Sequence, residues 1–205
     1  MLTMNELEKR IIDISYNEKI GHLSSTLNAV NIIEEIFNTK HQDEIFILSS
    51  GHAALALYVV IEKHHGKDAV ELFHKHGVHP HRDIDNHIHC STGSLGMGLT
   101  VAVGHALADR SKNVYCLLSD GESSEGSIWE SLRFIYEAKL DNLKVYVNIN
   151  GMTACDFIDK DYLVSRLKAF LPRIELRFTE VPNWPFAKGI LTHYYVLKPE
   201  DYAQL

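Results

Sequence analysis

The sequence has no long apolar run, no excess of basic residues and few cysteines, and each of these absences excludes a class of protein. No stretch approaches the roughly 20 apolar residues that a transmembrane helix requires. The formal net charge of −7 argues against binding to nucleic acid or to an anionic membrane surface. The three cysteines, Cys90, Cys116 and Cys155, form no CxxC pair, so we expect neither a disulfide framework nor a thiolate zinc site.

The remaining composition is that of a soluble globular protein. Of the 205 residues, 45% are apolar and 23% are charged, which suffices for one domain with a hydrophobic core. No repeat, low-complexity tract or linker divides the chain, so we expect residues 1–205 to form a single domain. The first ten residues lack the apolar region of a signal peptide, and a reducing cytoplasm is therefore the expected compartment.

Short apolar runs alternate with helical patterns along the chain. Apolar residues at helical spacing predict helices over residues 7–14, 27–37 (capped by Thr26), 53–62, 99–108 and 128–135. The runs typical of strands span residues 44–48, 114–118, 145–149, 174–181 and 194–197. This alternation predicts an α/β fold, doubly wound, in which a mostly parallel sheet has helices on both faces.

Polar residues follow two of these strands directly. Asp120-Gly121 comes after the strand at 114–118, and Asn150-Gly151 comes after the strand at 145–149. If the strands are neighbours, their axes lie about 5 Å apart, and Asp120 and Asn150 reach a common point. Carboxylate and amide oxygens with a main-chain carbonyl suit Mg²⁺, which in turn binds phosphate oxygens. Alternatively, Asp-Gly and Asn-Gly are ordinary turn dipeptides.

Several motifs, in the order in which they occur, resemble the transketolase family. They are GHLSS (21–25), LSSGHAALALY (48–58), His79-Pro80, STGSLGMGL (91–99) and Asp120-Gly121 with Asn150. The segment between Asp120 and Asn150 also resembles the family's thiamine diphosphate motif, including Glu125, Glu130 and Leu140-Asp141-Asn142-Leu143. One departure is Ser119, where the family commonly has glycine. The resemblance covers roughly residues 5–152 and implies the thiamine diphosphate-binding fold, in its diphosphate-type domain.

The resemblance also implies a role for each matching residue. The residues implied to hold Mg²⁺ are Asp120, Asn150 and Met152, the last through its main-chain carbonyl. The residues implied to contact thiamine diphosphate are His52, Gly93, Leu95, Asp120, Gly121, Asn150 and His193, although the local match around His193 is poor. The residues implied to act in catalysis are His22 and His79, which face the reacting carbon and the sugar, and Glu125. Glu125 and Glu130 match acidic residues at the family's subunit interface, where Glu125 communicates with the partner's catalytic glutamate.

In this family that glutamate sits on a separate pyrimidine-binding domain, and the chain stops before such a domain. The resemblance therefore implies one subunit of a two-component transketolase, expected as an α₂β₂ assembly, that transfers a two-carbon ketol unit from a ketose to an aldehyde. The substrate would be a sugar or sugar phosphate. Two alternatives remain open. One is another thiamine diphosphate enzyme, of the deoxyxylulose-phosphate-synthase or decarboxylating type, and the other is a non-catalytic regulatory module.

Histidine is unusually frequent, with 13 residues, and six of them lie between residues 74 and 89. These are His74, His76, His79, His81, His87 and His89. Their alternate spacing along an expected loop is not the i, i+4 spacing of a helical zinc pair, so solvated loop histidines are the main alternative to a metal cluster. His81, His87 and His89 could also line a substrate entrance. Cys155 is expected to be a small buried residue.

Overall fold

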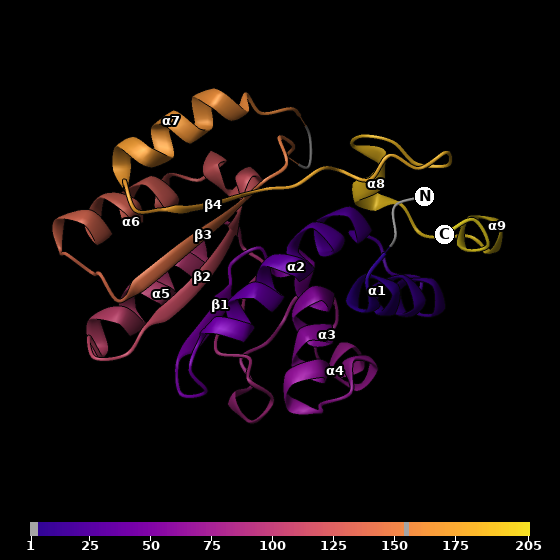
Figure 1. Cartoon of the computed structure of the whole chain (residues 1–205), viewed down its shortest axis with the longest axis horizontal. Coiled ribbons are helices and arrows are strands. Elements are labelled where there is room, and N and C mark those ends of the chain that lie inside the picture. Colours follow the sequence, from indigo (N-terminus) through magenta and orange to yellow (C-terminus); the bar gives the residue numbers. More distant parts are fainter. Residues whose placement is uncertain (1–3, 154–155) are drawn as a thin grey trace.

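A parallel sheet forms the centre of the computed structural model (Figure 1). The structure describes residues 4–153 and 156–205, so the prediction for Cys155 lies outside the described residues. Within them the sheet consists of β1 (Ile45–Leu48), β2 (Val114–Ser119), β3 (Leu143–Ile149) and β4 (Glu175–Phe178). The strands lie in the order β1-β2-β3-β4, and each neighbouring pair is parallel. The α/β class predicted from the sequence is confirmed.

Helices cover both faces of this sheet, as the sequence predicts (Figure 1). On one face α5 (Met97–Ala108), α6 (Gly126–Glu137) and α7 (Lys160–Phe170) bury alternate residues of β2 and β3, such as Cys116 and Val145. On the other face α2 (Leu23–Thr39) and α3 (Ala54–His65) pack with Leu117 in a second core that also contains α1 (Glu6–Asn17) and α4 (Ala69–His76). Because both faces are covered, β2 is apolar along nearly its whole length.

The start of α2 differs from the prediction, which placed Thr26 at the N-cap. The helix begins at Leu23, and the N-cap is His22, which adopts the left-handed conformation (φ 59°, ψ 22°). Thr26 lies inside the helix, where its hydroxyl donates to the carbonyl oxygen of His22 at 3.0 Å. The cap prediction was wrong because the chain enters the helix one turn earlier, directly after Gly21.

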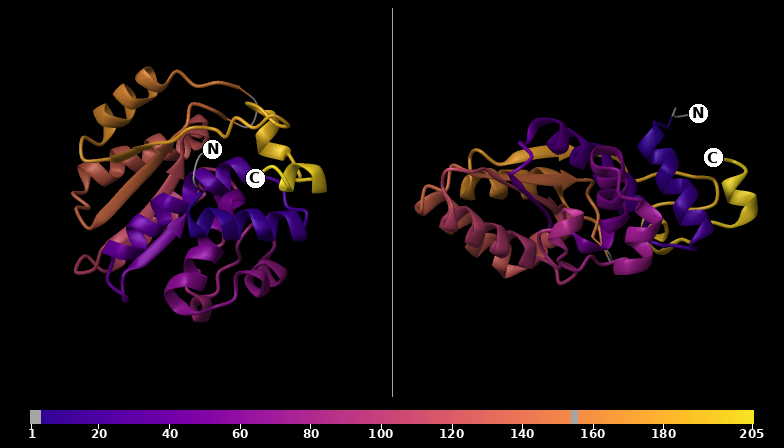
Figure 2. Two further views of the ribbon diagram at one scale, coloured as in Figure 1. Left: turned by 45° about the vertical axis from the view of Figure 1, so that its right-hand side comes forward. Right: turned by 90° about the horizontal axis from the view of Figure 1, so that it is seen from below.

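The C-terminal region also departs in part from the prediction. β4 is confirmed, but residues 194–197 form no strand: the short helix α8 (Leu191–Tyr194) ends there, and α9 (Pro199–Tyr202) follows. Leu197 is instead buried against the helical core that contains α1. Both views in Figure 2 show the C-terminal segment beside α1, where the ring of Tyr202 stacks on that of Tyr16 with centroids 4.3 Å apart. None of the described helices has the length and apolar character needed to cross a membrane.

Two glycines of α5 provide a matched test of how closely the helix approaches the sheet. A methyl group at Gly98 would lie 2.6 Å from the Cα of Ser49, whereas one at Gly104 would meet no described atom within 4 Å beyond the adjacent backbone of its own helix. We expect Gly98→Ala to lower the free energy of unfolding by about 1–3 kcal/mol through overpacking. Gly104→Ala should raise it by up to about 1 kcal/mol, because alanine favours the helix. Urea unfolding measures the free energy of unfolding of both variants. Equal changes of the same sign would contradict the close approach of α5 to Ser49 at Gly98.

Candidate active site

The carboxyl ends of β2 and β3 bring Asp120 and Asn150 together. The register pairs Ser119 with Asn148, so the two loops leave the same edge of the sheet side by side. One carboxylate oxygen of Asp120 accepts hydrogen bonds from the backbone N–H groups of Asn150 (2.9 Å) and Gly151 (2.6 Å). The other oxygen accepts one from Gly121 N–H at 3.0 Å. The convergence expected from the strand order is therefore present.

The donor set at this edge fits a hard divalent cation. Asp120 is buried, with 1% of its surface exposed, and no described Lys, Arg or His forms an ion pair with it. Burial raises the pKa of this carboxyl, and hydrogen bonds from backbone N–H groups, those of Gly151, Asn150 and Gly121 ahead of its own, offset part of that rise. A carboxylate has about four lone-pair positions. The N–H groups of Asn150, Gly151 and Gly121 occupy three of them, which leaves one position of Asp120 to bind a cation. The Oδ1 atom of Asn150 accepts a hydrogen bond from Met152 N–H (2.8 Å) and keeps a second lone pair.

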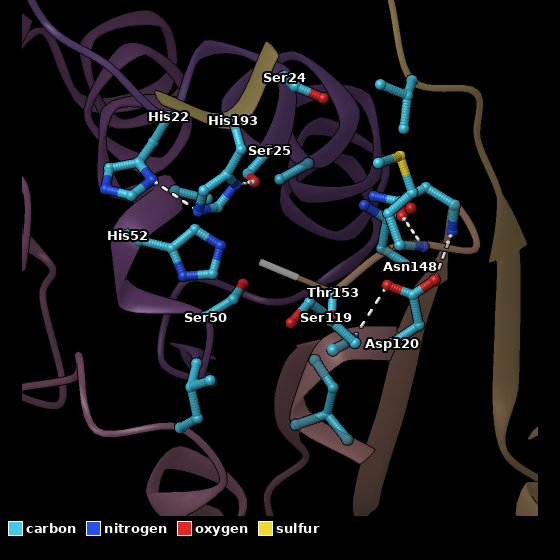
Figure 3. A pocket seen from close by; sticks show the side chains of 18 of the residues that line it. His22, Ser24, Ser25, Ser50, His52, Ser119, Asp120, Asn148, Thr153 and His193 are labelled. Atoms are coloured by element: carbon cyan, nitrogen blue, oxygen red, sulfur yellow. Dashed lines mark hydrogen bonds between the residues drawn. The ribbon is translucent and has the colours of Figure 1, made fainter. Parts of the chain in front are cut away.

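A cavity of about 510 Å³ opens over this edge (Figure 3). Ten of the residues singled out in the sequence line it: His22, His52, His79, Gly93, Leu95, Asp120, Gly121, Asn150, Met152 and His193. They come from several separate segments of the chain, the last of which is α8. The structure thus gathers nearly the whole candidate set around one space large enough for a small-molecule ligand.

His22, His52 and His193 form a cluster on one side of the cavity (Figure 3). The Nδ1 atom of His22 lies 3.0 Å from Nε2 of His193, and Nδ1 of His193 lies 3.2 Å from the Ser25 hydroxyl. The ring of His52 is centred 5.5 Å from both other rings. The backbone N–H of His22 also donates to the carbonyl oxygen of His193 at 2.7 Å. These contacts fix α8 against the start of α2.

The three imidazoles of this cluster are neutral at neutral pH. Burial, reinforced by the neighbouring histidines, lowers the pKa of His52 to about 3 and that of His193 to about 4. Burial also lowers the pKa of His22, with a smaller contribution from His79. In the His22–His193 contact one of the two facing nitrogens therefore carries a hydrogen and donates a hydrogen bond, and the other accepts that bond. Neutral imidazoles of this kind can both donate and accept protons.

His79 lies at another wall of the cavity, against the glycine-rich turn. The side chain is exposed, and a methyl group at Gly93 would lie 3.0 Å from its Cδ2 atom. Gly93 has a φ of 149°, which side-chain-bearing residues rarely adopt, so both conformation and space favour glycine here. Both residues line the cavity, so the His79 ring lies beside the glycine-rich turn at its wall.

Among the residues implied to act in catalysis or to bind the cofactor or Mg²⁺, only Glu125 is absent from the described cavity lining. It is half-buried at the N-cap of α6, beside Gly96 of the glycine-rich turn. Glu130 is exposed on the same helix. Both positions are compatible with a contact between subunits, and the role of Glu125 remains a prediction.

The remaining histidines are engaged elsewhere. His74 and His76 were expected in a loop, but they lie in the last turn of α4, where they pair with Glu18 (2.9 Å) and Asp83 (3.1 Å). His87 stacks on His65 with ring centroids 3.6 Å apart. Across residues 4–153 and 156–205, no group of three or more His, Cys, Asp or Glu is arranged to hold a metal ion. The described cavity lining includes none of His81, His87 and His89, and their place at a substrate entrance stays a prediction.

One residue that the sequence analysis missed is Glu122. It is fully buried, and its carboxylate accepts the backbone N–H of Ser119 at 3.0 Å in a capping box. The spacing Ser119-x-x-Glu122 is the sequence signature of that motif and could have identified it.

Comparisons with known proteins show which family this chain resembles. A family model described as 1-deoxy-D-xylulose-5-phosphate synthase matches residues 2–170. Transketolase from Pongo abelii is 36% identical over 176 residues, which cover 75% of this chain and 28% of that protein. One of the subunits of apulose-4-phosphate transketolase, from Phocaeicola vulgatus, is 31% identical over 166 residues, covering 70% of this chain and 58% of that one. The chain thus spans between a quarter and three fifths of the length of these relatives.

The same fold is found in solved structures. A transketolase mutant, R525L, from Pichia stipitis superimposes with a TM-score of 0.71 at 19% identity. The match covers 98% of this chain and 40% of that one. At this identity the likeness establishes the fold alone.

Proposed function

The chain belongs to the transketolase family, as an N-terminal domain of that family, and from this premise we propose that it is the diphosphate- and magnesium-binding subunit of a thiamine diphosphate-dependent transferase. The observation that carries the proposal is the convergence of Asp120 and Asn150 at one edge of the sheet, beneath a cavity lined by the histidine cluster. The family match over residues 2–170 supports it.

In this proposal Mg²⁺ is held by the Asp120 carboxylate, the Asn150 amide oxygen and the Met152 carbonyl. Mg²⁺ favours oxygen ligands and completes its coordination with water and phosphate oxygens, so a diphosphate is the ligand it would bring. A methyl group at Gly121 would lie 3.6 Å from the Cα of Thr153 and 3.8 Å from the Met152 oxygen, in ordinary contact with the loop that follows β3. His52 is placed to donate to a diphosphate oxygen, because its neutral ring carries one N–H. Both ring nitrogens of His193 contact His22 and Ser25, so His193 would donate to the diphosphate only by exchanging one of these contacts.

Thiamine diphosphate, when bound, supplies a nucleophilic carbon and an electron sink for cleaving a C–C bond. The chain itself supplies binding, orientation and proton transfer. His22 and His79 both line the cavity, and each can exchange a proton with a sugar hydroxyl. The contact between His22 and His193 holds the Nδ1 side of the His22 ring, which leaves its Nε2 atom for such an exchange. Gly93 and Leu95 offer a turn and an apolar surface to the cofactor's rings.

The reaction we propose is the transfer of a two-carbon ketol unit from a ketose to an aldehyde, with a sugar or sugar phosphate as substrate. Two relatives named as transketolases support ketol transfer. The name of the matching family model, 1-deoxy-D-xylulose-5-phosphate synthase, favours a second candidate, in which a 2-oxoacid is the donor. Product analysis with each donor class distinguishes the two.

We further propose that catalysis requires a second subunit carrying the pyrimidine-binding domain and its glutamate, in an α₂β₂ assembly. The relative from Phocaeicola vulgatus is itself named as one of the subunits of a transketolase, which supports this arrangement. The positions of Glu125 and Glu130 at the start of α6 are compatible with it, because neither side chain is fully buried within this chain.

Reconstitution tests the two-subunit proposal. The chain is mixed with a candidate pyrimidine-domain chain, sought first in the adjoining reading frame, and assayed with a ketose donor, an aldehyde acceptor, thiamine diphosphate and Mg²⁺. We expect ketol transfer only when both chains are present. Turnover by this chain alone would contradict the division of the active site.

A further inference from the structure

Glu122 is a buried carboxylate to which the proposed chemistry assigns no role. It lies in the short helix η3 (Asp120–Ser124), directly behind the cavity, and 0% of its surface is exposed. It is absent from the described cavity lining, and no described Lys, Arg or His forms an ion pair with it. A carboxylate is costly to bury unless hydrogen bonds replace the water that it loses, so its partners indicate what it does.

Those partners belong to three different loops. One carboxylate oxygen of Glu122 accepts hydrogen bonds from the Ser49 hydroxyl (2.6 Å) and from the Gly96 backbone N–H (2.9 Å). The other accepts the Ser119 backbone N–H at 3.0 Å. Ser49 follows β1, Gly96 precedes α5, and Ser119 ends β2. A single side chain thus joins three loops that are up to 70 positions apart in the sequence.

Each of these loops carries residues of the candidate site. The loop after β1 continues into η1 (Gly51–Ala53), which presents His52. The turn before α5 presents Leu95, and the loop after β2 presents Asp120. The three hydrogen-bond partners of Glu122 are therefore close in sequence to His52, Leu95 and Asp120, which line the cavity.

The loops also touch one another through their backbones. A methyl group at Gly51 would lie 2.6 Å from the carbonyl carbon of Thr92, and one at Gly98 would lie 2.6 Å from the Cα of Ser49. No side chain fits between these segments. The segment after β1 therefore cannot move toward residues 92–98 without displacing them, and Glu122 bonds to both segments and to the end of β2.

We propose that Glu122 is a positioning residue, which fixes these three loops at the spacing at which His52, Leu95 and Asp120 contact one cofactor molecule together. The inference rests on the proposed function, because it concerns binding of thiamine diphosphate in the same cavity. Glu122 itself touches neither cofactor nor substrate; it acts through Ser49, Gly96 and Ser119. An anionic acceptor suits this role, since hydrogen bonds to a carboxylate are shorter and stronger than those to a neutral group.

The substitution Glu122→Gln tests the proposal with little change in shape. A glutamine amide has one acceptor oxygen, and its NH₂ group must face one of the two backbone donors, either Ser119 N–H or Gly96 N–H, although the Ser49 hydroxyl can turn to accept from it. One side of the bridge is lost in either orientation. We expect the Kd for thiamine diphosphate with Mg²⁺, measured by calorimetry on the full chain, to rise at least about tenfold, which corresponds to about 1.4 kcal/mol. Glu137→Gln, an exposed carboxylate of α6 that pairs with Arg133, is the matched control.

Hydrogen exchange provides a readout that a general loss of stability would not imitate. The amides of Gly96 and Ser119 donate to Glu122, so in the Glu122→Gln protein without cofactor at least one of them should exchange about tenfold faster, while the amide of Val147 in β3 is unchanged. Should this variant fail to fold, Ser49→Ala removes one donor only. We then expect a smaller rise in Kd and faster exchange at Gly96.

The outcomes separate this inference from the proposed function. Weaker cofactor binding together with selective exchange at Gly96 or Ser119 supports the positioning role. Wild-type affinity in the variant, or faster exchange spread evenly over the chain, overturns it. If the wild-type chain itself fails to bind thiamine diphosphate with Mg²⁺, the proposed function fails. Faster exchange confined to the amides of Gly96 or Ser119 in the Glu122→Gln protein would then still show that Glu122 holds the loops together. Unchanged exchange at both amides would refute that role.

Discussion

Replacing Asp120 by Asn is expected to weaken binding of thiamine diphosphate with Mg²⁺ by about 100-fold or more, which corresponds to about 2.7 kcal/mol. The side chain keeps its size but loses the negative charge that attracts the cation. Its NH₂ group would also face the backbone N–H groups of Asn150 and Gly151, or that of Gly121, which now donate to the carboxylate. Isothermal titration calorimetry of the folded chain measures the change in Kd.

Asp141→Asn is the control for this experiment. Asp141 lies in the connection between α6 and β3, and its side chain is 82% exposed. We expect that variant to bind the cofactor as the wild type does, because a surface charge contributes little to a site that it does not contact. An Asp120→Asn protein that is folded and binds within twofold of the wild type would remove Asp120 from the proposed cation site.

Replacing His22 by Ala is expected to lower kcat/KM for ketol transfer by about 10²- to 10⁴-fold in the reconstituted enzyme, the usual contribution of general acid–base catalysis. Burial lowers the pKa of His22, so the ring is neutral and can take up a proton at neutral pH. The Kd for thiamine diphosphate should change much less, because other residues hold the diphosphate. Steady-state kinetics and calorimetry on the same preparation separate the two effects.

His74→Ala is the matched control for the His22 experiment, because His74 is exposed on α4 and pairs only with Glu18 among the described carboxylates. It should leave both kcat/KM and cofactor binding unchanged. A His22→Ala enzyme with wild-type kcat/KM would show that His22 takes no part in proton transfer. A loss confined to cofactor affinity would instead assign it to binding.

The sequence predicted the central fold and the Asp120–Asn150 edge because both depend on local signals. The run at 114–118 is apolar without alternation and that at 145–149 is interrupted only by Asn148, which is typical of strands covered on both faces, and the helix between them implies parallel neighbours. Once β2 and β3 are adjacent, the residues that follow them must lie close together. No tertiary information is needed for that step.

Other features depend on contacts that no local pattern records. His193 reaches the cavity only because α8 packs on α2, where its ring meets that of His22 from 171 positions away. Residues 194–197 were wrongly predicted as a strand because only part of the apolar run is buried: Leu197 and, in part, Tyr195 pack against the helical core, whereas Tyr194 and Val196 are exposed. The role of Glu122 could be suspected from its capping-box spacing, but its bonds to Ser49 and Gly96 required the folded chain.

The central claim is that this chain binds the diphosphate end of the cofactor through a divalent cation, and competition calorimetry tests it most directly. The wild-type chain is titrated with thiamine diphosphate, with thiamine and with pyrophosphate, each with Mg²⁺ and again after chelation by EDTA. We expect binding of thiamine diphosphate that requires Mg²⁺ and is displaced by pyrophosphate, and no measurable binding of thiamine. Binding that survives EDTA, or equal affinity for thiamine and its diphosphate, would contradict the claim.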